Sequence, residues 1–259
     1  MKILPQSLKA RLWRFLTKKM HLRWQLRSGL TAKIHSYADW CTYNEIFVNG
    51  EYDEALESTL KDLEGRQELV ILDIGANMGF FSLKLLDSFL WAQPKNTQLR
   101  LFLIEGSKQL CEELPQQLDI DHSRNGNTEV KVLNALAGKR SGSACFHVTK
   151  ESNQSFAGDT SPQGWQETQH VESIPYIDLI ELTQDMPCID LIKCDIEGSE
   201  FDFIEHYPAL LEKTQRIVLE IHESFGDTQA AISTLESMGF KTKSILREGT
   251  TTPLVFMER

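Results

Sequence analysis

Residues 70–83, with the sequence VILDIGANMGFFSL, decide the fold of this chain. The first five residues, VILDI, form a short apolar run rich in β-branched side chains, which indicates a strand buried on both faces. The run ends at the small residues of GANMG, positions 75–79, and a helix-like apolar pattern follows. A strand, a small-residue turn and a helix in this order hold a nucleotide-like ligand at the carboxyl end of a parallel sheet.

The turn has the pattern Asp73-x-Gly75-x-Asn77-x-Gly79, and the G-x-G-x-x-G pattern of NAD-binding turns is absent. The glycines let the backbone approach a ligand closely. A pyrophosphate favours a helix N-terminus without a nearby anion, whereas a cationic ligand is stabilised by a carboxylate such as that of Asp73. The pattern resembles the first motif of S-adenosylmethionine (SAM)-dependent methyltransferases, and its central Asn is similar to that of the FkbM family. An ordinary buried strand followed by a glycine turn is the alternative interpretation.

A second motif lies at residues 189–200, IDLIKCDIEGSE. It predicts a buried strand that ends in carboxylates, a glycine turn, and a helix opened by Ser199. The run Lys193-x-Asp195-x-Glu197-Gly198-x-Glu200 closely resembles the lysine–x–aspartate–x–glutamate–glycine–x–glutamate motif of FkbM methyltransferases. The resemblance extends from about residue 45 to residue 222 and leaves the first 36 residues outside it.

The remaining apolar runs complete a sheet. Residues 99–104, 129–133 and 216–221 predict further buried strands, and residues 240–246 and 253–257 predict a closing antiparallel hairpin. We therefore expect an α/β fold with a Rossmann-like, seven-stranded class I methyltransferase sheet. This sheet is mostly parallel with an antiparallel last strand, has helices on both faces, and follows an N-terminal helical extension. We expect two parts: a basic helical and aromatic extension at 1–60, and the methyltransferase domain at 61–259.

The first 38 residues contain nine Lys and Arg and no Asp or Glu. Leucines at helical spacing predict one or two basic helices within residues 1–36. A helical cap on the main domain is one interpretation; a peripheral contact with an anionic membrane surface or an acidic protein partner is the other. Residues 37–65 predict an aromatic segment followed by a helix from about 54 to 64.

The rest of the chain is acidic, with 18 of the 27 basic residues and all 37 acidic residues. This balance argues against a nucleic-acid partner, which requires clustered positive charge. The five cysteines form no CxxC pair, which is typical of reduced thiols in a cytosolic protein. No apolar run approaches the roughly 20 residues that cross a bilayer, and the N-terminus lacks the apolar region of a signal peptide. We expect a cytoplasmic protein.

The resemblance implies that SAM is the cofactor and that the turns after the first three strands hold it. Glu105 ends the second strand, where a carboxylate accepts hydrogen bonds from both ribose hydroxyls; a surface glutamate is the alternative. At the end of the third strand, where many relatives use an acidic residue at the adenine edge, this chain has Asn134. The expected cofactor-binding residues are Asp73, Gly75, Ala76, Asn77, Gly79, Phe80, Glu105, Gly106, Asn134, Ala135 and Asp195.

Four residues are candidates for catalysis. Asp195 ends the fourth strand, and Glu220 and His222 end the fifth on one face, so all three should meet at the carboxyl edge of the sheet. His222 is the expected general base, because an unperturbed imidazole titrates near neutral pH; Asp195 is the other candidate base or orients the acceptor. Lys193 lies on the same face and can pair with Asp195. The alternative for His222 is a histidine at a strand end that makes its hydrogen bonds within the protein and has no catalytic role.

Two carboxylates and an imidazole also suit Mg²⁺ or Mn²⁺, but the spacing is not diagnostic and we expect no metal. The polar segment 150–170 predicts a loop, and its Asn153-Gln154-Ser155 resembles a short motif of FkbM-like chains, so we expect it to cover the substrate.

These features predict SAM-dependent O-methylation of a hydroxyl on a sugar or small secondary metabolite, so the expected partner is a small-molecule or carbohydrate acceptor. One alternative is a non-catalytic protein that keeps the fold and interacts through its basic N-terminus. Another is an NAD-dependent oxidoreductase, which the missing third glycine and the C-terminal hairpin disfavour.

Overall fold

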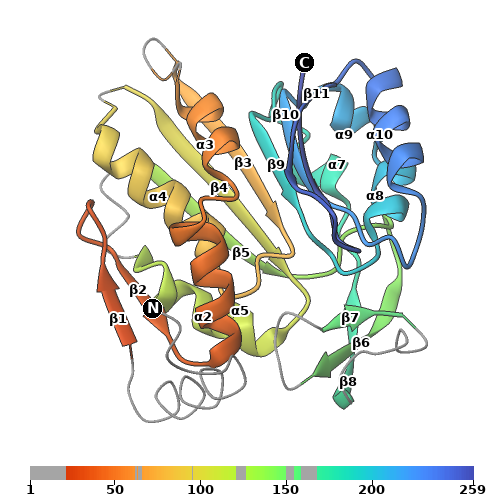
Figure 1. The fold of residues 1–259 in the computed structure, drawn as a ribbon, viewed down its shortest axis with the longest axis horizontal. Helices are drawn as coiled ribbons and strands as arrows, with labels where there is room; N and C mark the ends of the chain where they lie inside the picture. The colour runs from red at the N-terminus through yellow and green to blue at the C-terminus, as the bar shows by residue number, and fades with distance from the viewer. Residues whose placement is uncertain are drawn as a thin grey trace.

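A computed structural model describes residues 22–61, 63, 66–94, 96–120, 127–149, 155–158 and 168–259. Its centre is a seven-stranded sheet, and all the strands predicted for this sheet are present (Figure 1). The strands are β3 (Glu68–Ile74), β4 (Gln98–Glu105), β5 (Thr128–Asn134), β9 (Leu191–Cys194), β10 (Arg216–Glu220), β11 (Lys241–Arg247) and β12 (Leu254–Glu258).

The strand order is β11-β12-β10-β9-β3-β4-β5. Strands β5, β4, β3, β9 and β10 are parallel neighbours, whereas β12 runs antiparallel to both β10 and β11. This is the mostly parallel sheet with an antiparallel last strand that the sequence predicted. The order reverses beside β3, because the chain first continues to β4 and β5 and later returns to β9 on the other side. A ligand crevice is expected above that reversal point.

Alternation along β3 divides the core into two layers. Leu69 and Ile71 belong to one hydrophobic cluster, and Val70 and Leu72 belong to the other, because successive strand side chains point to opposite faces. The first cluster packs against α2 (Tyr37–Tyr43), α3 (Asp53–Leu60), α4 (Phe80–Ala92) and α5 (Lys108–Gln117). The second packs against α7 (Leu179–Leu182), α8 (Glu200–His206), α9 (Pro208–Glu212) and α10 (Thr228–Ser237). Both faces are therefore covered by helices, as predicted (Figure 1).

The prediction of helix over residues 22–36 is wrong, because these residues form a hairpin of β1 (Leu22–Gln25) and β2 (Thr31–Ile34). Gly29 has a φ of +97° in the connecting turn, and the amide of Leu26 donates to the carbonyl of Leu30. Buried residues then alternate along β2, which is a strand period, and the helical spacing of the leucines was coincidental. The helices predicted over residues 1–21 lie outside the described residues.

Residues 37–48 and 53–60 are helical. A capping box of Ser36 and Asp39 opens α2, a π-helical turn (Asn44–Val48) follows, and α3 ends at Leu60 rather than near residue 64. Leu30, Tyr43 and Leu56 are buried in the same cluster as β3 and α4. The described part of the segment 1–60 thus shares the main core.

A second, three-stranded sheet lies beside the carboxyl edge of the first (Figure 1). It consists of β6 (Ser143–Thr149), β7 (Phe156–Ala157) and β8 (Thr168–Pro175). Of the expected substrate-covering motif, Asn153 and Gln154 lie outside the described residues. Across the described ranges, no helix is both long and apolar enough to cross a membrane.

Candidate active site

The glycine turn after β3 is held by the neighbouring strands. The amides of Gly75 and Ala76 both donate to the carbonyl of Ile104, at 2.9 and 3.1 Å. Gly75 has a φ of +74°, and a Cβ atom added there would lie 1.7 Å from the carbonyl oxygen of Asp195. Because a backbone atom cannot yield as a flexible side chain can, glycine is required where β3 meets the end of β9.

Glu105 links this turn to the turn after β4. Its carboxylate oxygens accept hydrogen bonds from the backbone amides of Asn77 and Ser107, each at 2.8 Å. Burial raises the pKa of Glu105, and these two hydrogen bonds oppose the increase. Asn77 adopts a φ of +48°, a conformation that Asn accepts more readily than most residues. The result is a buried carboxylate with unused acceptor capacity on both oxygens.

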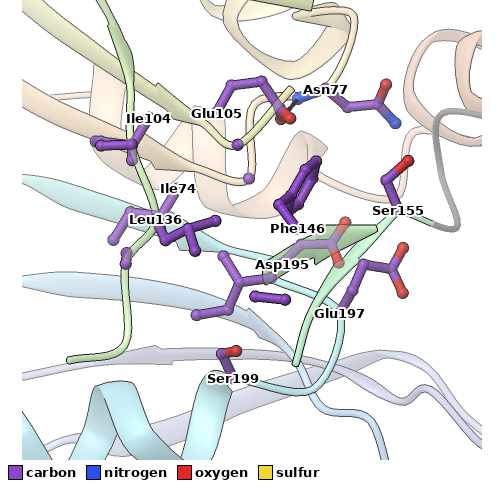
Figure 2. A pocket seen from close by; sticks show the side chains of 16 residues that line it. Ile74, Asn77, Ile104, Glu105, Leu136, Phe146, Ser155, Asp195, Glu197 and Ser199 are labelled. Atoms are coloured by element: carbon purple, nitrogen blue, oxygen red, sulfur yellow. Dashed lines mark hydrogen bonds between the residues drawn. The ribbon is translucent and has the colours of Figure 1, made fainter. Parts of the chain in front are cut away.

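A narrow cavity opens beside Glu105 (Figure 2). Ile74, Ile104 and Leu136 provide apolar contacts on one side, and the Ser155 hydroxyl and two carboxylates lie on the other (Figure 2). The small sheet closes the cavity with Phe146, Ser155 and Ala157. The predicted cofactor residues that line the cavity are Gly75, Asn77, Glu105, Gly106, Ala135 and Asp195.

The other predicted cofactor residues lie elsewhere. Asp73 is fully buried beneath the turn, where it accepts a hydrogen bond from Ser82 and lies 3.4 Å from Lys193. Gly79 packs against α5. The side-chain amide of Asn134 donates to the carbonyls of Glu105 and Gly106, so Asn134 supports the second turn.

Ala76 and Phe80 line a wider cleft next to the narrow cavity. The cavity volume of this cleft is about 630 Å³, which is within the range of small-molecule sites. The four predicted catalytic residues, Lys193, Asp195, Glu220 and His222, all line it. The two spaces share the lining residues Asn77, Asp195 and Glu197.

His222 does not fit the predicted role of general base. Its Nδ1 lies 2.9 Å from Glu200, and its Nε2 lies 3.0 Å from Glu197. Burial lowers the pKa of His222, but the hydrogen bonds to Glu197 and Glu200 outweigh this effect and raise it to about 11. The imidazole is therefore protonated at neutral pH and has no lone pair with which to accept a proton. The sequence prediction assumed an unperturbed histidine and missed the carboxylates on both sides.

Glu220 faces the same cleft and is paired with Arg247 at 2.9 Å. Arg247 also contacts Glu51, and so connects the N-terminal helices to the edge of the sheet. Burial and the charge of Asp195 raise the pKa of Glu220 to about 8, although the guanidinium opposes them. The cleft thus holds several carboxylates that lie close enough to raise one another's pKa values.

Asp195, Glu200 and His222 can each bring one potential ligand atom to within 4.8 Å of the others. The protonated imidazole is a poor metal ligand, however, because both of its nitrogens face carboxylates at hydrogen-bond distance. The donor set favours an internal ion-pair cluster over a cation site.

The sequence of the chain matches a known family. A model of the methyltransferase FkbM domain matches residues 73–242, which include the glycine turn, the second motif, the lining of the narrow cavity and part of the lining of the wide cleft. The chain belongs to the FkbM methyltransferase family. It is therefore a SAM-dependent methyltransferase, as the two motifs predicted.

Solved structures with similar folds are distant. The methyltransferase FkbM from Methylobacillus flagellatus KT is 18% identical over 76% of this chain and 45% of its own, with a TM-score of 0.48. The human methyltransferase 10 domain containing protein is 11% identical over 98% of both chains, with a TM-score of 0.49. The magnesium protoporphyrin IX methyltransferase from Synechocystis PCC 6803 is 12% identical over 85% of this chain and 92% of its own, with a TM-score of 0.46.

The methyltransferase spans less than half the length of the Methylobacillus protein. No curated protein matches it.

The residues of the narrow cavity fit SAM. The buried Oδ1 atom of Asn77 accepts no hydrogen bond from the described residues, although it belongs to a residue that lines the cavity. The Glu105 carboxylate has acceptor positions left for hydroxyl groups. Gly106 allows the turn after β4 to pack closely against the cavity wall, since a Cβ atom there would lie 2.6 Å from the Phe146 ring.

Sequence reasoning missed several residues of the site. Glu197 and Glu200 stand in the second motif, so they were visible but had no assigned role. Arg247 and Phe146 had no sequence signal, because each comes from a strand distant in sequence from both motifs.

Proposed function

We propose that this methyltransferase transfers the methyl group of SAM to a hydroxyl group on a sugar or a small secondary metabolite. When bound, SAM supplies an electrophilic methyl group on a sulfonium. Glu105, Asn77 and Gly75 are the residues that would hold it, because they line the narrow cavity and retain unused polar capacity.

The observation that carries this proposal is the polar cleft that shares Asp195 and Glu197 with the narrow cavity. Thr42, Ser224, Thr251 and Thr252 add hydroxyl groups to the carboxylates of its lining. Such a lining can hydrogen-bond the several hydroxyls of a polyol. Carboxylates at the shared edge can orient an acceptor hydroxyl and take its proton.

Product analysis tests the proposal. The full chain would be incubated with SAM carrying a ¹³C-labelled methyl group and a panel of methyl glycosides and polyhydroxylated metabolites. We expect a labelled product with the ¹³C chemical shift of an O-methyl group. A parallel panel of primary amines without hydroxyls should give no labelled product.

Binding is measured separately by titration calorimetry with SAM and S-adenosylhomocysteine. Labelled N-methyl products alone would refute the hydroxyl preference while leaving the methyltransferase activity intact. Binding of SAM and S-adenosylhomocysteine without turnover of any acceptor would instead favour a non-catalytic role.

A further inference from the structure

Glu197 occupies the junction between the narrow cavity and the wide cleft. It lies in the turn between β9 and α8, two residues after Asp195. Its side chain is 21% exposed, and its carboxylate points in the same direction as that of Asp195 (Figure 2). A group at this junction can reach molecules in both spaces.

The backbone of Glu197 is held in an unfavourable conformation. Its φ is +52°, in the left-handed region, which costs a residue with a Cβ atom roughly 1–2 kcal/mol. Gly198 follows with a φ of +103°, and a Cβ atom there would lie 2.4 Å from the ring of Phe225. Strain of this kind persists where the surrounding structure enforces it, and it is concentrated at functional sites.

A line of hydrogen bonds fixes the carboxylate. Glu200 is fully buried and accepts from the amides of Ile196 and Gly198, so it is anchored to the same turn. It also binds Nδ1 of His222, whose Nε2 contacts Oε2 of Glu197 at 3.0 Å. Because both imidazole nitrogens donate, His222 acts here as a cation that orients Glu197. One carboxylate oxygen of Glu197 is engaged in this contact, and the other is available to a molecule in the cleft.

We propose that Glu197 accepts the proton of the acceptor hydroxyl during methyl transfer, and that His222, anchored by Glu200, is the residue that positions it. This inference rests on the proposed function. The acceptor oxygen forms a bond to the methyl carbon while the bond from that carbon to sulfur breaks, and its electron pair stays on sulfur. The hydroxyl proton passes to Glu197, so the products are a methyl ether, S-adenosylhomocysteine and a neutral carboxyl group.

The electrostatic surroundings suit this role. Burial is the main cause that raises the pKa of Glu197 to about 7; Asp195 and Glu200 add to the increase, and His222 opposes it. Glu220 also faces this group, and Arg247 and Lys193 compensate the neighbouring carboxylates. A base whose pKa is close to the working pH transfers protons most effectively.

Two other carboxylates are rivals. Asp195 also lines both spaces, but it lies 3.8 Å from the buried ammonium of Lys193. Glu220 lines only the wide cleft and is bound to Arg247. Among these three carboxylates, Glu197 is the one whose cationic neighbour, His222, is bound by Glu200, which is hydrogen-bonded to the same turn as Glu197.

The first test follows turnover of the acceptor found in the glycoside panel. Glu197→Gln should lower kcat by at least about 10²-fold, the usual contribution of a general base, and should leave S-adenosylhomocysteine affinity within about threefold of the wild type. Glu205→Gln, an exposed change on α8, is the matched control and should leave kcat unchanged. His222→Gln should move the acidic limb of the kcat profile to higher pH, by about one unit, because the cation that lowers the pKa of Glu197 is gone.

A kcat of Glu197→Gln within threefold of the wild type would overturn the assignment. So would a loss of cofactor affinity of more than tenfold, which would make Glu197 a cofactor ligand. If either result is found, the kcat values of Asp195→Asn and Glu220→Gln identify which of these two carboxylates is the base.

The second test needs no acceptor. In protein labelled with ¹³C at the glutamate carboxyl carbons, the resonance missing from Glu197→Gln should titrate near pH 7 in the wild type. A Glu197 carboxylate already ionised at pH 5 would refute this inference even if the panel yields an O-methylated product, whereas a panel without any labelled product would refute the proposed function on which it rests.

Discussion

The ammonium group of Lys193 donates a 2.6 Å hydrogen bond to the carbonyl oxygen of Gly75. This contact joins the second motif to the first, across the neighbouring strands β9 and β3. The same ammonium lies 3.4 Å from Asp73 and 3.8 Å from Asp195. Although burial lowers the pKa of Lys193, the two carboxylates raise it, so the group stays charged.

Lys193→Met should destabilise the protein by about 3–5 kcal/mol, because it leaves two carboxylates without their buried cation. Urea denaturation measures the loss. Combining it with Asp73→Asn should give a smaller total loss than the sum of the two single changes. Lys213→Met is the control for losing a lysine whose hydrogen-bond partners are carbonyl groups, because Lys213 donates to the carbonyls of Thr183 and Met186. Additive single and double losses would mean that Lys193 and Asp73 are not coupled.

Gly75→Ala should destabilise the fold by about 2–4 kcal/mol and abolish S-adenosylhomocysteine binding, because its Cβ atom meets the backbone of Asp195. Gly142→Ala separates the clash from the effect of a positive φ: Gly142 also has a φ of +94°, but none of the described residues lies within 4 Å of an added Cβ atom. That control should lose only about 1 kcal/mol and bind normally. Equal losses in both variants would show that the clash is unimportant.

Glu105→Gln should weaken S-adenosylhomocysteine binding by about tenfold or more, because an amide group cannot accept hydrogen bonds on both sides as the carboxylate does. One of the amides of Asn77 and Ser107 then faces the NH₂ group of the glutamine. Titration calorimetry measures the affinity, with the exposed Glu112→Gln on α5 as control. Unchanged affinity in Glu105→Gln would place the ribose elsewhere.

The folded state raises the pKa of His222 from 6.5 to about 11. A raised pKa gives stability that is fully present below the unfolded pKa and is lost as the pH rises toward the folded value. The stability difference between the wild type and His222→Gln should therefore be largest near pH 6 and should shrink toward about pH 10. Chemical denaturation across this range measures it. A difference that grows with pH would mean that His222 is neutral in the folded protein.

Much of the fold followed from local patterns. The buried run at residues 70–74 and the acidic strand ends at Glu105 and Asp195 could be recognised because strand period and glycine turns are local properties. Residues 22–34 were predicted wrongly, because leucines at every fourth position, Leu22, Leu26 and Leu30, fit a helix, while the turn at Gly29 imposes a hairpin. The pattern did not contain the tertiary contacts that bury Leu30, Ala32 and Ile34.

The sequence by itself determined the buried strands, the glycine turn and the polar residues that follow the strands, because these depend on the chemistry of neighbouring residues. Only the tertiary structure decided how these residues are paired and which of them are charged. His222 is placed between Glu197 and Glu200, and this position holds its proton. The charge of a titratable group depends on burial and on partners from other segments, which no single stretch of sequence specifies.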